Sequence, residues 1–309
     1  MNDVALIAIR WALYVDLGLL FGLPLFALYA LGGGRTGQQN LPMTGPLIGL
    51  AVLGLILSAL GFMIQGAAMA GVPFTQPDVS ILGDLLNATA LGLALKMRIL
   101  ALLILLIGAP LLSRLPHAAT VVATIAGAVA LATLAWSGHG AAGEGSAGWL
   151  QLAADLIHLF AAGAWVGAIT AFLALAIPSI RSDEMERVSL AERALRGFAG
   201  IGTLIVGLLI LTGAVNGFFL VGPDHVAALG QSAYGLLLIA KLLLFALMLG
   251  LAGLNRFRLT PTLGLAIAQR DAAAAMVVLR RSLLVEGGLA IVILALVAWL
   301  GTLSPPMSA

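Results

Sequence analysis

The sequence predicts an all-α membrane protein with eight transmembrane helices. Composition is the first indication, because 61% of the 309 residues are hydrophobic and only 9% are charged, whereas about a quarter of residues in soluble proteins are charged. The second is that eight apolar stretches reach the length of about 20 residues that a helix needs to cross a bilayer. The third is that glycine and proline separate these stretches. A soluble globular domain is therefore excluded.

Hydropathy places the eight spans one after another along the chain. A helix satisfies its own backbone hydrogen bonds in lipid, so each long apolar stretch is expected to be a helix. The expected spans are residues 5–31, 46–70, 86–112, 118–137, 150–177, 199–221, 232–254 and 282–303. Glycine or proline follows each of them, for example Gly32, Pro178 and Pro261. The first span lacks a basic start and a small-residue cleavage site and contains Arg10, so we expect it to be retained.

The arginines of the loops orient the predicted bundle. Eleven of them fall on one side: Arg35, Arg114, Arg181, Arg187, Arg193, Arg196, Arg256, Arg258, Arg270, Arg280 and Arg281. By the positive-inside rule this side is cytoplasmic, so both termini are expected outside, in the periplasm of a Gram-negative bacterium. The chain is then a single polytopic domain, residues 1–309, in the bacterial inner membrane. The lipid bilayer is its expected surrounding. The 15 Lys and Arg residues barely exceed the 13 Asp and Glu residues, so we expect no nucleic acid as a partner.

Similar helix starts predict an internal repeat. Two spans open with a hydroxyl residue, a glycine three positions later and a basic residue further on: Thr89, Gly92 and Arg98, and then Ser232, Gly235 and Lys241. Four spans in residues 1–137 and four in residues 149–309 give two halves of the same orientation, a parallel repeat like those that frame a central site in some transporters. Chance similarity between helices rich in glycine, alanine and leucine is the alternative.

Ionisable residues inside the predicted spans are the first pointer to function. There are eight: Arg10, Asp16, Lys96, Arg98, Asp155, His158, Lys241 and Glu286. Each charged group at mid-bilayer costs roughly 2.5–3.5 kcal/mol on insertion scales, so each needs a partner or a purpose. Most lie in the outer half of their spans, and Glu286 alone is expected near a cytoplasmic end. Polar chemistry is therefore expected close to the periplasmic mouth of the bundle.

We expect charged and polar side chains inside the predicted spans to form an intramembrane polar network. Its members are Arg98, Lys241, Trp165, Asp16 and Glu286. The two basic residues, equivalent in the repeat, are placed to balance Asp155 and Asp16 as ion pairs. Snorkelling to the outer headgroups is the alternative for both of them.

The densest polar cluster lies in the fifth span. His158 is three residues after Asp155, and Trp165 is seven residues after His158; these spacings are close to one and two helical turns, so the three residues share one helix face. That face is expected to look inward. The imidazole of His158 offers a nitrogen to a metal ion or a haem iron, and Asp155 either orients the ring or is itself a ligand. A buried histidine that only hydrogen-bonds a neighbouring helix is the alternative.

Metal chemistry in this chain has to do without cysteine, of which there is none. His139 lies in a loop on the outer side, and imidazole together with carboxylate suits a divalent ion such as Cu²⁺. Thioether sulfur suits Cu(I), and among the nine methionines we single out Met97, which adjoins Arg98. The predicted metal ligands are therefore His158, Asp155, His139 and Met97, with core packing as the alternative for the methionine.

The second half resembles the copper resistance D (CopD) family of bacterial inner-membrane proteins, most closely over residues 149–303. The resemblance rests on several motifs in order: His158-x6-Trp165-x-Gly167, Tyr234-Gly235 to Lys241, Asn255-Arg256 followed by Pro261, Arg281-Ser282 with Glu286, and Leu303-Ser-Pro-Pro. The first half is similar in hydropathy and in Arg98. The family pattern coincides with these positions but does not say which of them touch copper.

This resemblance implies a copper-transport or copper-homeostasis protein that takes copper from the periplasmic side. It also implies a separate periplasmic copper-binding protein of the CopC type as partner. The chain contains no Walker loop or aspartyl-phosphate signature, so we expect no direct use of ATP, and an enzymatic activity is not expected.

A membrane oxidoreductase or electron carrier that binds haem b is the alternative function. An inward histidine with an aromatic residue on the same helix face also holds haem, and a distantly similar protoporphyrinogen oxidase family has a comparable His and Trp pattern. A copper sensor or a scaffold protein that does not transport copper is a third hypothesis.

Overall fold

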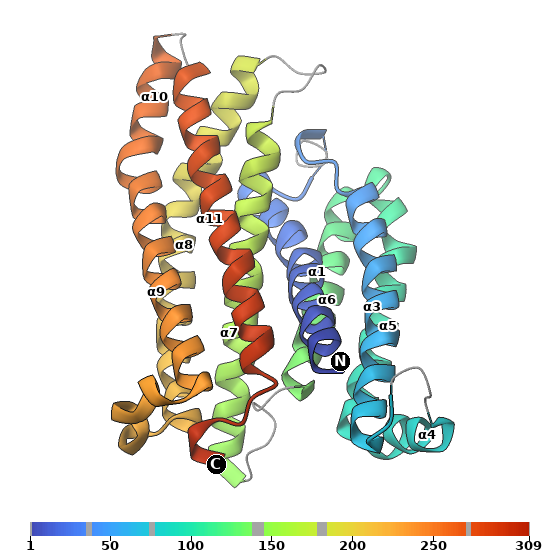
Figure 1. Ribbon diagram of the computed structural model, residues 1–309. Coiled ribbons are helices and arrows are strands. Elements are labelled where there is room, and N and C mark those ends of the chain that lie inside the picture. The colour runs from blue at the N-terminus through green and yellow to red at the C-terminus, as the bar shows by residue number, and fades with distance from the viewer. Residues whose placement is uncertain are drawn as a thin grey trace.

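The computed structural model describes residues 2–34, 39–73, 78–137, 145–177, 184–269 and 273–308, and its regular elements there are helices (Figure 1). Their bounds are α1 (Asn2–Leu31), α3 (Thr44–Ala70), α4 (Val79–Ala88), α5 (Ala90–Gly108), α6 (Pro116–Ala132), α7 (Gly145–Ala176), α8 (Glu184–Leu220), α9 (Ala233–Leu254), α10 (Thr260–Ala268) and α11 (Ala273–Leu300). Short 3₁₀ segments follow α5 and α6, and η4 (Pro223–Gln231) precedes α9. Eight helical stretches are long and apolar enough to cross a membrane, which confirms the eight predicted spans.

Two helix boundaries differ from the prediction. Pro261 was expected to end the seventh span, but α9 continues through a π-helical turn, Asn255–Leu259, into α10. Pro261 occupies the first turn of α10, where a missing N–H is tolerated. The third span was expected to begin at residue 86, but Thr89 is extended and separates α4 from α5. Both differences are local, because hydropathy cannot distinguish a short break from a continuous helix.

The short helix α4 lies across one end of the bundle (Figure 1). Asp78 caps it, because the carboxylate accepts hydrogen bonds from the hydroxyl and from the backbone N–H of Ser80. The hydroxyl bond first, and then the backbone bond, lower the pKa of this exposed carboxyl.

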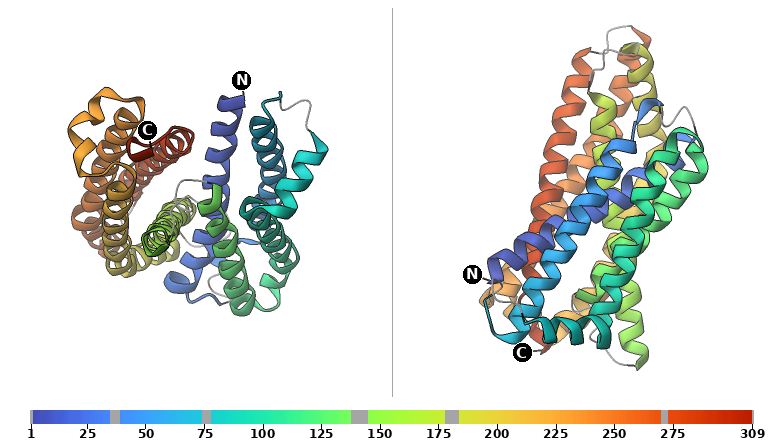
Figure 2. Two further views of the ribbon diagram at one scale, coloured as in Figure 1. Left: turned by 90° about the horizontal axis from the view of Figure 1, so that it is seen from below. Right: turned by 90° about the vertical axis from the view of Figure 1, so that its right-hand side faces the viewer.

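The long helices form two groups, which meet where α1 of one group and α7 of the other lie side by side (Figures 1 and 2). One group consists of α1, α3, α5 and α6, and the other of α7 to α11. In the first group α3 packs against α5, whereas in the second α8 and α9 make few direct contacts. The second group is therefore more open between two of its helices.

Glycines bring α1 and α7 together along the centre of the molecule. Gly18 and Gly22 of α1 face Gly163 and Gly167 of α7, so that a Cβ atom added to Gly22 would lie 2.8 Å from the Cα of Gly167. Each helix thus contributes two small residues four positions apart, the arrangement that lets membrane helices approach most closely. This contact joins the two groups of helices.

An aromatic cluster extends the same junction to α8. Phe26 of α1 packs edge-on against Phe172 of α7, with the ring centres 5.0 Å apart. Phe172 in turn contacts Phe198 of α8, which also meets Trp165. These rings fix α1, α7 and α8 relative to one another, because edge-to-face pairs add to the packing of their area.

The two similar helix starts form the same local structure. Thr89 and Ser232 are both extended N-caps, and their hydroxyls accept hydrogen bonds from the backbone N–H groups of Gly92 and Gly235 at 3.1 and 3.0 Å. A short helix precedes the cap in both places. The four-plus-four repeat and the orientation of the termini in the membrane stay predictions.

Alanine at Gly235 is expected to destabilise the protein, because the added Cβ atom would lie 2.7 Å from the Cα of Leu229. Forced contacts of this kind typically cost about 1–3 kcal/mol. The melting temperature of the purified protein in detergent measures the loss. Gly230→Ala is the matched control, since nothing lies within 4 Å of its added Cβ. An equal melting temperature for the two variants would contradict the prediction.

Candidate functional site

His158 of α7 points to α8 and hydrogen-bonds Thr212. The distance between Nδ1 and the threonine Oγ1 is 2.9 Å. The same hydroxyl donates its only proton to the carbonyl oxygen of Leu208, 2.5 Å away. It must therefore accept the bond to His158, which assigns the proton of the neutral ring to Nδ1. The lone pair is then on Nε2, the state in which an imidazole binds a metal ion.

Asp155 and Lys241 stand close to this imidazole. Asp155 lies one turn before His158 on α7, and Lys241 of α9 is near enough to interact electrostatically with both residues. The centre thus combines an imidazole and a carboxylate of α7 with an ammonium group of α9. An opposite charge nearby lowers the cost of a carboxylate inside the membrane.

Trp165 and Glu286 belong to a separate part of the second group. Trp165 is buried two turns further along α7 than His158, and Glu286 is buried on α11. The Nδ2 of Asn255 donates to the Glu286 carboxylate at 2.9 Å. The indole N–H of Trp165 lies close to the same carboxylate without the geometry of a regular hydrogen bond. Since α11 already begins at residue 273, Glu286 lies at the middle of its helix, which corrects the expected position near a helix end.

A cavity of about 260 Å³ adjoins this carboxylate. It lies between α7, α8, α9 and α11, and its walls include Trp165, Phe198, Asn255 and Glu286. The π-helical turn that begins at Asn255 forms part of the wall; such turns are frequent at functional sites. The second group thus contains two separate clusters of polar side chains, one around His158 and one around Glu286.

Leucine in place of Asn255 is expected to leave the buried carboxyl of Glu286 without its hydrogen-bond donor. An unsatisfied buried polar group costs about 1–3 kcal/mol, so the melting temperature should fall. The double variant Asn255→Leu, Glu286→Leu should recover part of the loss, because no polar group is then stranded. A double variant that is no more stable than Asn255→Leu alone would contradict this account of the pair.

Arg98 does not meet Asp16, one of the two carboxylates that the basic residues were expected to balance. The Nε of Arg98 donates to the hydroxyl of Thr133, beyond the end of α6, at 2.7 Å. Both carboxylate oxygens of Asp16 lack a hydrogen-bond partner among the described residues. Asp16 faces α3 instead, where Gly54 leaves it room: a Cβ atom there would lie 2.6 Å from Oδ2. Arg98 is only 5% exposed, so it does not snorkel to the surface.

Of the two other predicted ligands, the structure describes only Met97, which it does not bring to His158. Met97 is 43% exposed on the outer surface of α5, a helix that packs against α3 and α6. His139 lies outside the described residues. No group of three or more metal-binding side chains is found in the described part of the chain.

The structure adds two residues that the sequence did not single out, Thr212 and Thr133. Each hydroxyl donates to a carbonyl of its own helix, Leu208 or Ala130, and is left as an acceptor for a side chain from elsewhere. Threonines in membrane helices usually make such internal bonds. The sequence therefore gives no signal for the second bond, which joins each hydroxyl to a side chain of another helix.

Eight apolar helices with an imidazole, a carboxylate and an ammonium group inside the bundle define a polytopic membrane protein with an intramembrane polar centre. Residues 1–149 match the family "Copper resistance protein D-like, N-terminal domain", and residues 192–300 match "Copper resistance protein D". The chain belongs to the copper resistance protein D family. Neither match includes His158.

Two relatives support this assignment. The chain is 41% identical over 310 residues to "Copper resistance protein D" of Pseudomonas syringae pv. tomato, covering 100% of this chain and 99% of that protein. It is 31% identical over 121 residues to "Copper transport protein CutJ" of Bacillus subtilis, covering 39% of this chain and 21% of that protein. No solved structure matches the chain. The family is therefore one of copper resistance and copper transport membrane proteins.

Proposed function

We propose that this protein transports copper across the bacterial inner membrane and takes it from the periplasmic side at His158. The observation that carries the proposal is the hydrogen bond from Nδ1 to Thr212, which leaves Nε2 ready for a metal ion inside the bundle. Asp155 one turn away is the second donor. The names of two relatives, copper resistance and copper transport, support copper as the cargo.

The neighbourhood of Lys241 suits a passing ion better than a stored one. Imidazole and carboxylate together attract Cu²⁺, while the ammonium group close to both repels it. Conduction requires a site that binds well enough to admit the ion and weakly enough to release it. Two protein donors and one opposing charge meet this requirement. Waters or a loop residue such as His139 would complete the coordination.

A separate periplasmic copper-binding protein of the CopC type would deliver the ion. The family resemblance supports this partner. His158 lies in the half of α7 that begins after the loop containing His139, the loop that the arginine distribution places outside. Delivery from that side reaches the imidazole before it reaches Glu286.

Copper accumulation in cells with and without the protein tests the proposal. Transport from the periplasm predicts more cell-associated copper and greater copper sensitivity when the protein is made. Unchanged accumulation together with unchanged sensitivity would refute it. An absorbance spectrum of the purified protein tests haem b in the same preparation: a Soret band that disappears in His158→Ala would support the haem alternative and overturn the copper site.

A further inference from the structure

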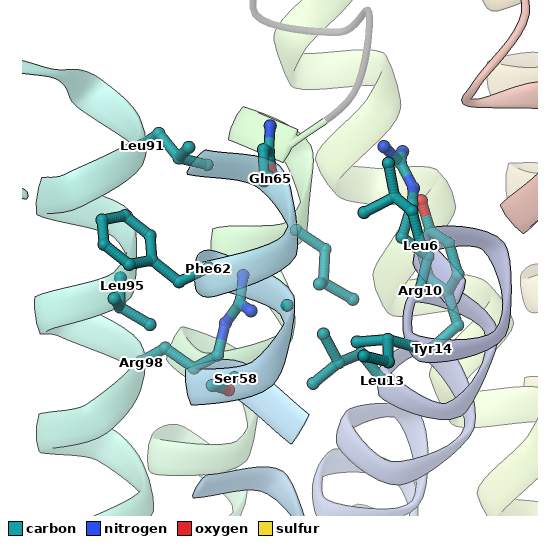
Figure 3. A pocket seen from close by; sticks show the side chains of 13 residues that line it. Leu6, Arg10, Leu13, Tyr14, Ser58, Phe62, Gln65, Leu91, Leu95 and Arg98 are labelled. Atoms are coloured by element: carbon teal, nitrogen blue, oxygen red, sulfur yellow. The ribbon is translucent and has the colours of Figure 1, made fainter. Parts of the chain in front are cut away.

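A small pocket inside the first group of helices has a positively charged lining. It lies between α1, α3 and α5, has a volume of about 40 Å³, and is polar at Arg10, Tyr14, Ser58, Gln65 and Arg98. Figure 3 shows Arg98 extending from α5 across α3, with Arg10 and Tyr14 on α1 at the opposite wall. Two guanidinium groups line the pocket, and its lining contains no carboxylate.

Arg98 is a buried cation without a counter-charge from the described residues. Its Nε donates to Thr133, and its two terminal nitrogens have no acceptor among the residues that the structure describes. Asp16 of α1 does not supply this counter-charge through a hydrogen bond, because its carboxylate oxygens make none with the described residues. A charge inside a membrane protein normally pairs with an opposite charge or lines a route for ions. Arg98 does not pair with an opposite charge from the described residues.

Ser58 provides a second unsatisfied group in the same pocket. It is 2% exposed, and its Oγ has no hydrogen-bond partner in the described part of the chain. It lines the pocket together with Arg98 and Gln65. A hydroxyl and an amide can each donate a hydrogen bond, and a guanidinium can only donate. The pocket is thus rich in donors and carries positive charge.

We propose that this pocket binds a small inorganic anion of the halide class, with chloride as the natural ligand. The anion supplies the counter-charge that Arg98 lacks and accepts the hydrogen bond of Ser58. A water needs roughly 10–15 Å³ of such space, so about 40 Å³ holds a monatomic anion and little more. A phospholipid headgroup does not fit. Because two guanidinium groups repel copper, this site is distinct from His158 and independent of the transport proposal.

Thermal unfolding of the purified full-length protein in detergent tests the site. The protein is titrated with sodium chloride against sodium gluconate at constant ionic strength, with sodium phosphate as a third arm. Chloride should raise the melting temperature by about 5 °C at saturation relative to gluconate, and line broadening of the ³⁵Cl resonance should report the same binding. No difference between chloride and gluconate overturns the proposal. Stabilisation by phosphate alone also overturns it, in favour of an oxyanion or headgroup.

Three variants connect the effect to the pocket. Arg98→Gln should abolish the chloride dependence, and Ser58→Ala should weaken it. Arg114→Gln, an exposed arginine away from the pocket, should retain it in full. If Arg98→Gln fails to fold, Ser58→Ala and the chloride titration of the unmodified protein still decide. Chloride dependence that is equal in Ser58→Ala and Arg114→Gln contradicts the assignment to this pocket.

Discussion

Valine in place of Gly167 is expected to reduce the yield of folded protein by about tenfold or more. A Cβ atom at this position would lie 2.7 Å from the carbonyl oxygen of Gly22. Backbone atoms cannot rotate away as a side chain does, so α1 and α7 must separate. The cost should exceed about 3 kcal/mol, the upper end of typical overpacking, and abundance falls several-fold already for 1–2 kcal/mol.

The size-exclusion profile of the detergent-extracted protein measures this yield. Gly207→Val is the matched control, because Gly207 lies within α8 and nothing surrounds its added Cβ atom within 4 Å. The control should elute as the unmodified protein does. If Gly167→Val gives the same monodisperse peak at the same yield as Gly207→Val, the contact between α1 and α7 does not join the two groups of helices.

The sequence predicts the spans well and their contacts poorly. Length and composition suffice for eight helices, because lipid imposes the same requirement on each of them. Pro261 was read as a helix end because proline usually breaks a helix, whereas here it opens the first turn of α10. The position of Glu286 along its helix was also mispredicted, because α11 begins before the apolar stretch and Glu286 lies at the middle of the helix.

The sequence also predicts poorly which charged residues pair with each other. Arg98 was expected to balance a carboxylate within the membrane, such as Asp16, but the sequence does not say on which side of a neighbouring helix a partner lies. Arg98 bonds to Thr133 and Asp16 faces Gly54. The spacing of Asp155 and His158 predicts a common face correctly, because it depends only on the turn of one helix. That the face meets Thr212 depends on how α7 packs against α8.

Alanine in place of His158 is expected to abolish copper transport, the largest functional effect that the site predicts. The variant removes the only described nitrogen ligand of the proposed site and leaves the hydroxyl of Thr212 bonded to Leu208. The fold should persist, because that hydroxyl keeps an internal partner. Copper uptake by cells or proteoliposomes measures the change, with the size-exclusion profile as the check on folding.

Thr212→Val distinguishes a metal ligand from a histidine that only joins two helices. Valine has nearly the shape of threonine but cannot accept the Nδ1 proton, so Nε2 is no longer held free, and loss of such a supporting bond typically lowers metal affinity about 10–100-fold. Thr170→Val is the matched control, because this threonine of α7 bonds only to the carbonyl of Val166. A supporting role for Thr212 requires weaker copper binding in Thr212→Val than in Thr170→Val. Equal copper affinity in these two variants would mean that the tautomer is not fixed by Thr212, and transport that persists in His158→Ala would remove the imidazole from the copper path altogether.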